Sequence, residues 1–135
     1  MKYEEITQKI IGAAYTVYNF LGFGFLESIY KKALGIELTK LNLKFEEEKP
    51  LKVYYEGKAI GDFYIDLLVE DEIIVELKSV QNLIKEHEVQ LVNYLTALKK
   101  EIGLLINFGH AGVEIRRKYK KPFPKEDCCS VSSGN

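Results

Sequence analysis

The 135-residue sequence contains no apolar run long enough to span a membrane, and its only two cysteines, Cys128 and Cys129, are adjacent. Neighbouring cysteines cannot connect distant parts of a fold, so nothing indicates an oxidising compartment. The first ten residues, MKYEEITQKI, carry acidic side chains early and lack the apolar core of a signal peptide. We therefore expect a cytoplasmic protein that does not contact a membrane.

The sequence also lacks an excess of basic residues and a cluster of zinc ligands. Lys and Arg number 19 against 20 Asp and Glu, which gives a net charge of −1. A protein that coats nucleic acid electrostatically is usually far more basic, whereas a nuclease can bind through a local patch and a metal. No His and Cys residues have the spacing of a zinc site, so zinc is not expected.

The sequence does contain the amphipathic segments of one domain, without internal repeats or an interdomain linker. Apolar residues at helical spacing and at alternating spacing predict the order helix, helix, three or four antiparallel strands, helix, strand, strand. A helix between two strands favours their parallel pairing. We therefore expect an α/β domain over residues 1–121, with helices packed on a mixed sheet and a polar, flexible tail over 122–135. The predicted helices cover 3–21, 25–41 and 84–100, and the predicted strands cover 43–47, 51–55, 59–69, 73–80, the LLINF segment after Gly103, and 113–119.

Residues 63–80, FYIDLLVEDEIIVELKSV, predict two strands joined by an acidic turn. The strands are rich in Ile, Leu and Val, as strands buried on both faces tend to be, yet Asp66, Glu76 and Lys78 lie within them. Side chains alternate between faces along a strand, so Glu76 and Lys78 point the same way. If residues 70–72 form the turn, Asp66 lies opposite Glu76. One face then carries two carboxylates and an ammonium group.

Like charges opposite each other destabilise a sheet, and a buried unpaired carboxylate is costly. A bound divalent cation would remove this cost. Hard oxygen ligands suit Mg²⁺ or Mn²⁺, with Asp66 and Glu76 as ligands and the backbone carbonyl of Leu77 as a third. Such a metal supports hydrolysis of a phosphodiester, where Lys78 would stabilise the developing negative charge. Alternatively, Glu76 and Lys78 are a solvated pair and Asp66 is an unrelated residue at a strand edge.

The sequence resembles the PD-(D/E)xK nuclease superfamily and, more closely, the small GxxExxY family within it. The name-giving motif is present as GFLESIY, from Gly24 to Tyr30, and the catalytic segment as Asp66 followed by IVELK, from Ile74 to Lys78. The segments HEVQLVNYL and GLLINFG are also similar to this family. The D…ExK element alone is weakly specific, but four segments in this order are a specific pattern over roughly residues 6–118. No proline precedes Asp66, a departure that the superfamily tolerates.

The resemblance implies a restriction-endonuclease-like fold with an αβββαβ core, and it implies roles for particular residues. Asp66, Glu76 and Lys78 match the metal-binding and catalytic core. Glu27 matches an acidic residue that many members bring from the preceding helix to support a metal or its water. Gln90 and Tyr94 form Q-x3-Y, similar to the motif of RecB-like nucleases, where these residues sit beside the active site and help to hold DNA.

The residues themselves leave simpler interpretations open. Glu27 can be a solvated helix charge, and Tyr30 can be a packing aromatic whose hydroxyl is satisfied rather than a substrate contact. His87 shares a helical face with Gln90 and Tyr94 and can contact a phosphate, or it can be satisfied by its neighbours.

The leading interpretation is a metal-dependent nuclease that acts on nucleic acid, with DNA favoured over RNA by the resemblance to RecB-like nucleases. The alternative is a nuclease-fold module that binds nucleic acid or assembles with proteins and has little or no turnover. The near-neutral net charge of the chain favours this alternative. A third interpretation is a metal-dependent hydrolase of another phosphate ester. The small size also leaves room for a homo-oligomer or a partner protein.

Overall fold

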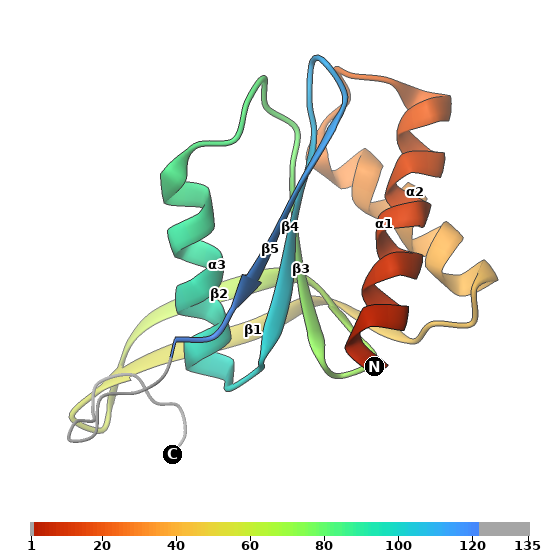
Figure 1. The fold of residues 1–135 in the computed structure, drawn as a ribbon. Coiled ribbons are helices and arrows are strands. Elements are labelled where there is room, and N and C mark those ends of the chain that lie inside the picture. The colour runs from red at the N-terminus through yellow and green to blue at the C-terminus, as the bar shows by residue number, and fades with distance from the viewer. Residues whose placement is uncertain (1, 122–135) are drawn as a thin grey trace.

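The computed structural model describes residues 2–121, so the expected tail at 122–135, with Cys128 and Cys129, lies outside the described residues. Within them, three helices and five strands form one mixed α/β arrangement (Figure 1). The elements are α1 (Lys2–Leu21), α2 (Glu27–Lys40), β1 (Phe45–Tyr55), β2 (Lys58–Val69), β3 (Ile73–Lys78), α3 (Lys85–Leu98), β4 (Ile102–Phe108) and β5 (Val113–Tyr119).

The five strands form a single sheet in the order β1-β2-β3-β4-β5. β3 and β4 are parallel, and the other neighbours are antiparallel. The parallel pair is joined through α3, as a crossover requires. The β2–β3 turn is the predicted 70–72 segment, because Val69 pairs with Ile73. The expected mixed sheet flanked by helices is confirmed.

Helices cover both faces of the sheet, with α1 and α2 on one face and α3 on the other (Figure 1). Alternation along the strands explains the division: Val75 and Leu77 pack under α1 and α2, while Ile74 packs under α3. Glu76 and Lys78 follow Ile74 by two and four residues, so their side chains point to the same face of the sheet as Ile74. These charged side chains therefore belong to the face that α3 covers.

β1 and β2 form a long hairpin whose tip projects past one end of α3 (Figure 1). The two strands predicted at 43–47 and 51–55 are one continuous strand, β1, in which Pro50 pairs with Tyr64. β1 has a neighbour on one side only, and such an edge strand tolerates a residue without a backbone N–H.

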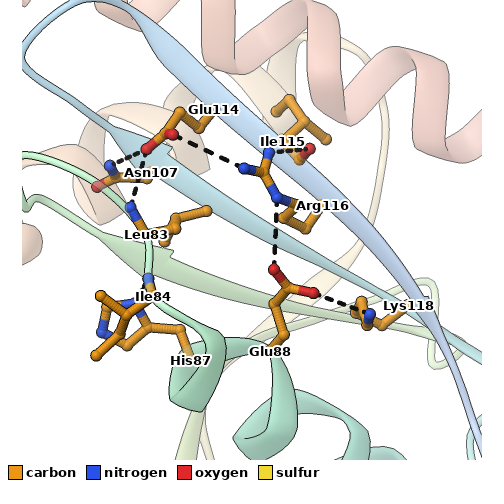
Figure 2. A network of polar contacts seen from close by, with 9 residues as sticks. All are labelled: Leu83, Ile84, His87, Glu88, Asn107, Glu114, Ile115, Arg116 and Lys118. Atoms are coloured by element: carbon orange, nitrogen blue, oxygen red, sulfur yellow. Dashed lines mark hydrogen bonds and ion pairs between the residues drawn. The ribbon is translucent and has the colours of Figure 1, made fainter.

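A polar network fastens α3 to the sheet (Figure 2). Glu88, on the first turn of α3, forms ion pairs with Lys118 at 3.0 Å and Arg116 at 3.5 Å. Hydrogen bonding to Lys118 lowers the pKa of the Glu88 carboxyl. Arg116 and Lys118 of β5 thus have an acidic partner, and Lys120, just after the strand, pairs with Glu101 at 3.5 Å.

None of the helices within residues 2–121 combines the length and the apolar character that crossing a membrane requires.

Close packing of α3 on the sheet depends on Gly103 of β4. A Cβ at this position would lie 2.9 Å from Leu91 Cδ1 and 3.1 Å from the carbonyl oxygen of Ile74. We expect Gly103→Ala to lower the free energy of unfolding by about 1–3 kcal/mol, measured by urea denaturation, because the core has no room for the methyl group. Gly12→Ala on α1 is the matched control: its Cβ meets nothing within 4 Å, so it should be neutral or stabilising. Equal stability of the two variants would contradict this account of the packing.

Candidate active site

The carboxylates of Asp66 and Glu76 lie side by side where the β2–β3 ladder ends. The ladder stops at the Leu67–Val75 pair, and its register extended by one residue brings Asp66 opposite Glu76. There the side chains replace the backbone ladder: the Asp66 N–H donates to Glu76 Oε2 at 3.0 Å, and the Leu77 N–H donates to Asp66 Oδ2 at 2.8 Å. Each strand therefore holds the carboxylate of the other in a fixed place.

Asp66 is also left out of the backbone pairing between β1 and β2. Pairing between β1 and β2 runs through Glu47–Leu67 and resumes at Lys49–Ile65, and the intervening Glu48 has a positive φ of 52°. Interruptions of this kind re-aim side chains in sheets. The local irregularity frees the Asp66 N–H to bind Glu76.

The Glu76 side chain is buried, and the residue is only 7% exposed. Burial, followed by the charge of Asp66, raises the pKa of Glu76 from 4.5 to about 8. The Asp66 N–H and the nearby Lys78 ammonium oppose this shift, and Glu27 adds to it. Loss of solvation is therefore the main cost of ionising Glu76, and repulsion by Asp66 adds to it.

The donor set fits a hard divalent cation. Two carboxylates converge, and the rise in the pKa of Glu76 shows that positive charge would be favourable between them. Within residues 2–121 no group of three or more His, Cys, Asp or Glu side chains is close enough to hold a metal ion. Mg²⁺ commonly uses one or two carboxylates and fills its other positions with water and phosphate oxygens, so two are sufficient.

Glu27 is exposed at the first position of α2, and it lies near enough to Glu76 to raise the pKa of that residue. Lys31, one turn after Glu27 on α2, is positioned to pair with it but does not. Lys31 forms an ion pair with Glu48 of β1 instead. Glu27 thus faces the site without this competitor.

Tyr30 is fully buried and anchors the segment between α1 and α2. Its ring stacks on Phe108 at a centroid distance of 4.3 Å, its hydroxyl donates to the Gly22 carbonyl, and it accepts from the Phe25 N–H at 3.3 Å. The Phe25 carbonyl in turn accepts from Ser79 Oγ at 2.7 Å. Tyr30 therefore links the helix that begins with Glu27 to the end of the strand that carries Lys78.

Gln90, Tyr94 and His87 all lie on α3 but in different surroundings. Tyr94 reaches the carboxylates: burial, and then Glu76 and Asp66, raise the pKa of its hydroxyl. Gln90 is exposed and lies one turn earlier. His87 is engaged at the start of the helix, where its Nδ1 accepts from the Ile84 N–H at 3.1 Å.

Asn107 is a supporting residue that the sequence analysis did not single out. It is fully buried and pairs in register with Lys78. Its side chain forms two hydrogen bonds with the backbone of Val80: the Val80 N–H donates to Oδ1, and the Val80 carbonyl accepts from Nδ2, both at 2.9 Å. Nδ2 also donates to Glu114 at 2.8 Å (Figure 2). These bonds end β3 at Lys78, two residues before the predicted end. A polar residue inside the apolar LLINF run was the available signal.

The burial of Glu76 makes the stability of the metal-free protein depend on pH. Since its pKa is raised in the folded state to about 8, the folded protein binds more protons than the unfolded chain above pH 4.5. The free energy of unfolding should therefore fall as pH rises from about 4.5 to about 8, by on the order of 3–5 kcal/mol. Urea denaturation in a chelating buffer at several pH values measures it.

Glu76→Gln removes the titrating group and should flatten this pH dependence. The control Glu47→Gln, at an exposed position of β1, should keep the wild-type slope. A Glu76→Gln protein that still loses stability over the same pH range would show that another group is responsible.

Comparisons with known proteins agree with this arrangement. The crystal structure of SSO0001 superposes with a TM-score of 0.55 at 20% identity, over 72% of this chain and 52% of that one, so the match spans about half the length of SSO0001 and supports the fold. A search of curated proteins found no match. A sequence model described as the PD-(D/E)XK nuclease superfamily matches residues 4–118. Because this match includes both helices before the sheet, all five strands and the Asp66–Glu76 pair, the chain belongs to the PD-(D/E)XK nuclease superfamily.

Proposed function

We propose that the chain is a metal-dependent nuclease domain of the GxxExxY type that hydrolyses phosphodiester bonds, with DNA as substrate. The observation that carries this proposal is the pair of converging carboxylates, Asp66 and Glu76, held by crossed hydrogen bonds next to Lys78. Retaining two such groups costs stability, and a cation is the partner that offsets the cost.

In this proposal Asp66, Glu76 and the Leu77 carbonyl hold Mg²⁺ or Mn²⁺, which supplies Lewis-acid activation of water and phosphate when bound. Lys78 lies on the same face as Glu76 and stabilises negative charge on the phosphate. Glu27, at the start of α2, orients a water molecule at the edge of the site.

Substrate is held from α3 in this proposal. Tyr94 lies close enough to the carboxylates to contact a nucleotide placed there, and Gln90 extends the contact along the helix. Tyr30 and His87 act indirectly, because their polar atoms hold the segment before α2 and the first turn of α3. The cytoplasm remains the expected compartment from the sequence.

A second candidate function is a nuclease-fold module that binds or assembles without turnover. The net charge of −1, together with the pairing of Arg116 and Lys118 to Glu88, favours it, since these cations are engaged within the fold. The two functions differ in metal binding and in cleavage.

Metal binding is measured by calorimetry with Mn²⁺ on the wild type and on Asp66→Asn. This variant removes the charge but keeps an oxygen that can accept the Leu77 N–H. We expect its affinity to fall about 100-fold or more, beyond the usual effect of an outer-shell residue. The matched control Asp62→Asn, on the same strand but exposed, should bind like the wild type. Unchanged Mn²⁺ affinity in Asp66→Asn would contradict the proposed ligand set.

Cleavage is measured with labelled DNA and RNA in Mn²⁺ or Mg²⁺. Lys78→Ala should lower the cleavage rate by roughly 10²–10³-fold while leaving Mn²⁺ affinity near that of the wild type, because the ammonium group acts on the phosphate. Lys40→Ala, at the end of α2, serves as the control and should cleave normally. Tight metal binding without cleavage of either nucleic acid would favour the non-catalytic module or another phosphate ester.

A further inference from the structure

An apolar groove of about 650 Å³ runs between α3 and the distal part of the β1–β2 hairpin. Its size is within the range of small-ligand sites, about 300–1,000 Å³. Ile60, Phe63 and Val89 line it and are 65%, 40% and 47% exposed. Apolar side chains gathered in a groove and left open to water indicate a binding surface.

The groove adjoins the candidate active site at Tyr94. Tyr94 lines the groove and also senses the charges of Glu76 and Asp66. Phe63 precedes Asp66 by three residues on β2, a distance of about 10 Å along a strand. A base stacked on Phe63 is therefore within about 10 Å of Asp66 along the strand.

The floor of the groove is aromatic and held in position. The Phe63 and Tyr94 rings lie 5.8 Å apart with an interplanar angle of 47°. A Cβ on Gly61 would lie 3.0 Å from the Phe63 ring, so the ring covers the bare backbone of this glycine. Substitution of Gly61 would push the ring away.

The polar groups of the groove are mainly uncharged. The side chains of Gln90 and Asn93 offer amide donors and acceptors, and Lys85 and Glu86 contribute opposite charges. The groove therefore has no excess of positive charge that would bind a phosphate. A flat ring with an apolar face and hydrogen-bonding edges is the chemistry that fits, and a nucleobase has this form.

We propose that this groove binds an unpaired nucleobase of single-stranded nucleic acid and thereby places the adjoining phosphate at Asp66 and Glu76. Bases in a duplex are stacked and paired, so their faces are unavailable to the exposed Phe63 ring. The inference rests on the proposed function and adds to it the substrate class, a single strand or a frayed end.

The test measures binding, not cleavage, by fluorescence anisotropy. The probe is a short labelled oligodeoxynucleotide, single-stranded or annealed as a blunt duplex, in buffer with Ca²⁺ and again with a chelator. We expect the single strand to bind at least about tenfold more tightly than the duplex. Phe63→Ala should weaken single-strand binding by roughly 5- to 100-fold, from the loss of one base–aromatic stack. A 2-aminopurine in the strand should be quenched by the wild type and less by Phe63→Ala.

Three further variants separate stacking from folding. Phe63→Tyr should retain binding, and Phe63→Leu should lose it while melting near the wild type. Tyr15→Ala on α1 removes a ring of similar exposure, 45%, from the opposite side of the sheet and should have no effect. If Phe63→Ala fails to fold, Phe63→Leu carries the test.

Equal binding of duplex and single strand would overturn the inference, and so would single-strand binding that is unaffected in Phe63→Leu. The absence of any oligonucleotide binding would also overturn it and would indicate that the groove binds a protein partner. Cleavage of duplex DNA with no preference for single strands would contradict the proposed role of the groove but would agree with the proposed nuclease function. Phe63-dependent binding of single strands without metal-dependent cleavage would support the groove and count against the nuclease.

Discussion

The two crossed hydrogen bonds between β2 and β3 are the interaction on which the candidate site depends. They join the Asp66 N–H to Glu76 and the Leu77 N–H to Asp66. Backbone donors that a sheet would ordinarily use in its ladder here hold two carboxylates in place. These donors partly offset the repulsion between the two carboxylates, which lie together in a mostly buried position. The energetic balance still favours the neutral form of Glu76, whose pKa is raised to about 8.

The surrounding fold supplies rigidity at this point. Asn107 grips Val80 just beyond Lys78, and Tyr30 and Ser79 connect the same end of β3 to the segment before α2. Tyr30 lies in the core under α1 and α2, whereas Asn107 pairs in register with Lys78 and so lies on the face that also carries Glu76. The site is therefore supported from both faces of the sheet.

The proposed use of the groove is compatible with the net charge of −1. Stacking and hydrogen bonding with an unpaired base do not require a large positive surface, and the positive charge that a phosphate needs can come from Lys78 and a bound cation. The pairing of Arg116 and Lys118 with Glu88 is consistent with this view, because these residues stabilise α3 and so shape one wall of the groove.

The sequence by itself determined the order of the elements, the parallel β3–β4 pair and the approach of Asp66 to Glu76, because these follow from local periodicity, a three-residue turn and strand alternation. It could not determine what bonds those carboxylates make, since the skipped pairing at Asp66 depends on the neighbouring β1 as well as β3. The sequence alone could not decide whether Pro50 interrupts a strand or lies on an edge strand, because an edge position is a property of the whole sheet. The anchoring by Tyr30 and Asn107 and the groove beside Phe63 join residues far apart in sequence. Only the tertiary structure decided them, because burial and contact between distant segments leave no periodic pattern in the chain.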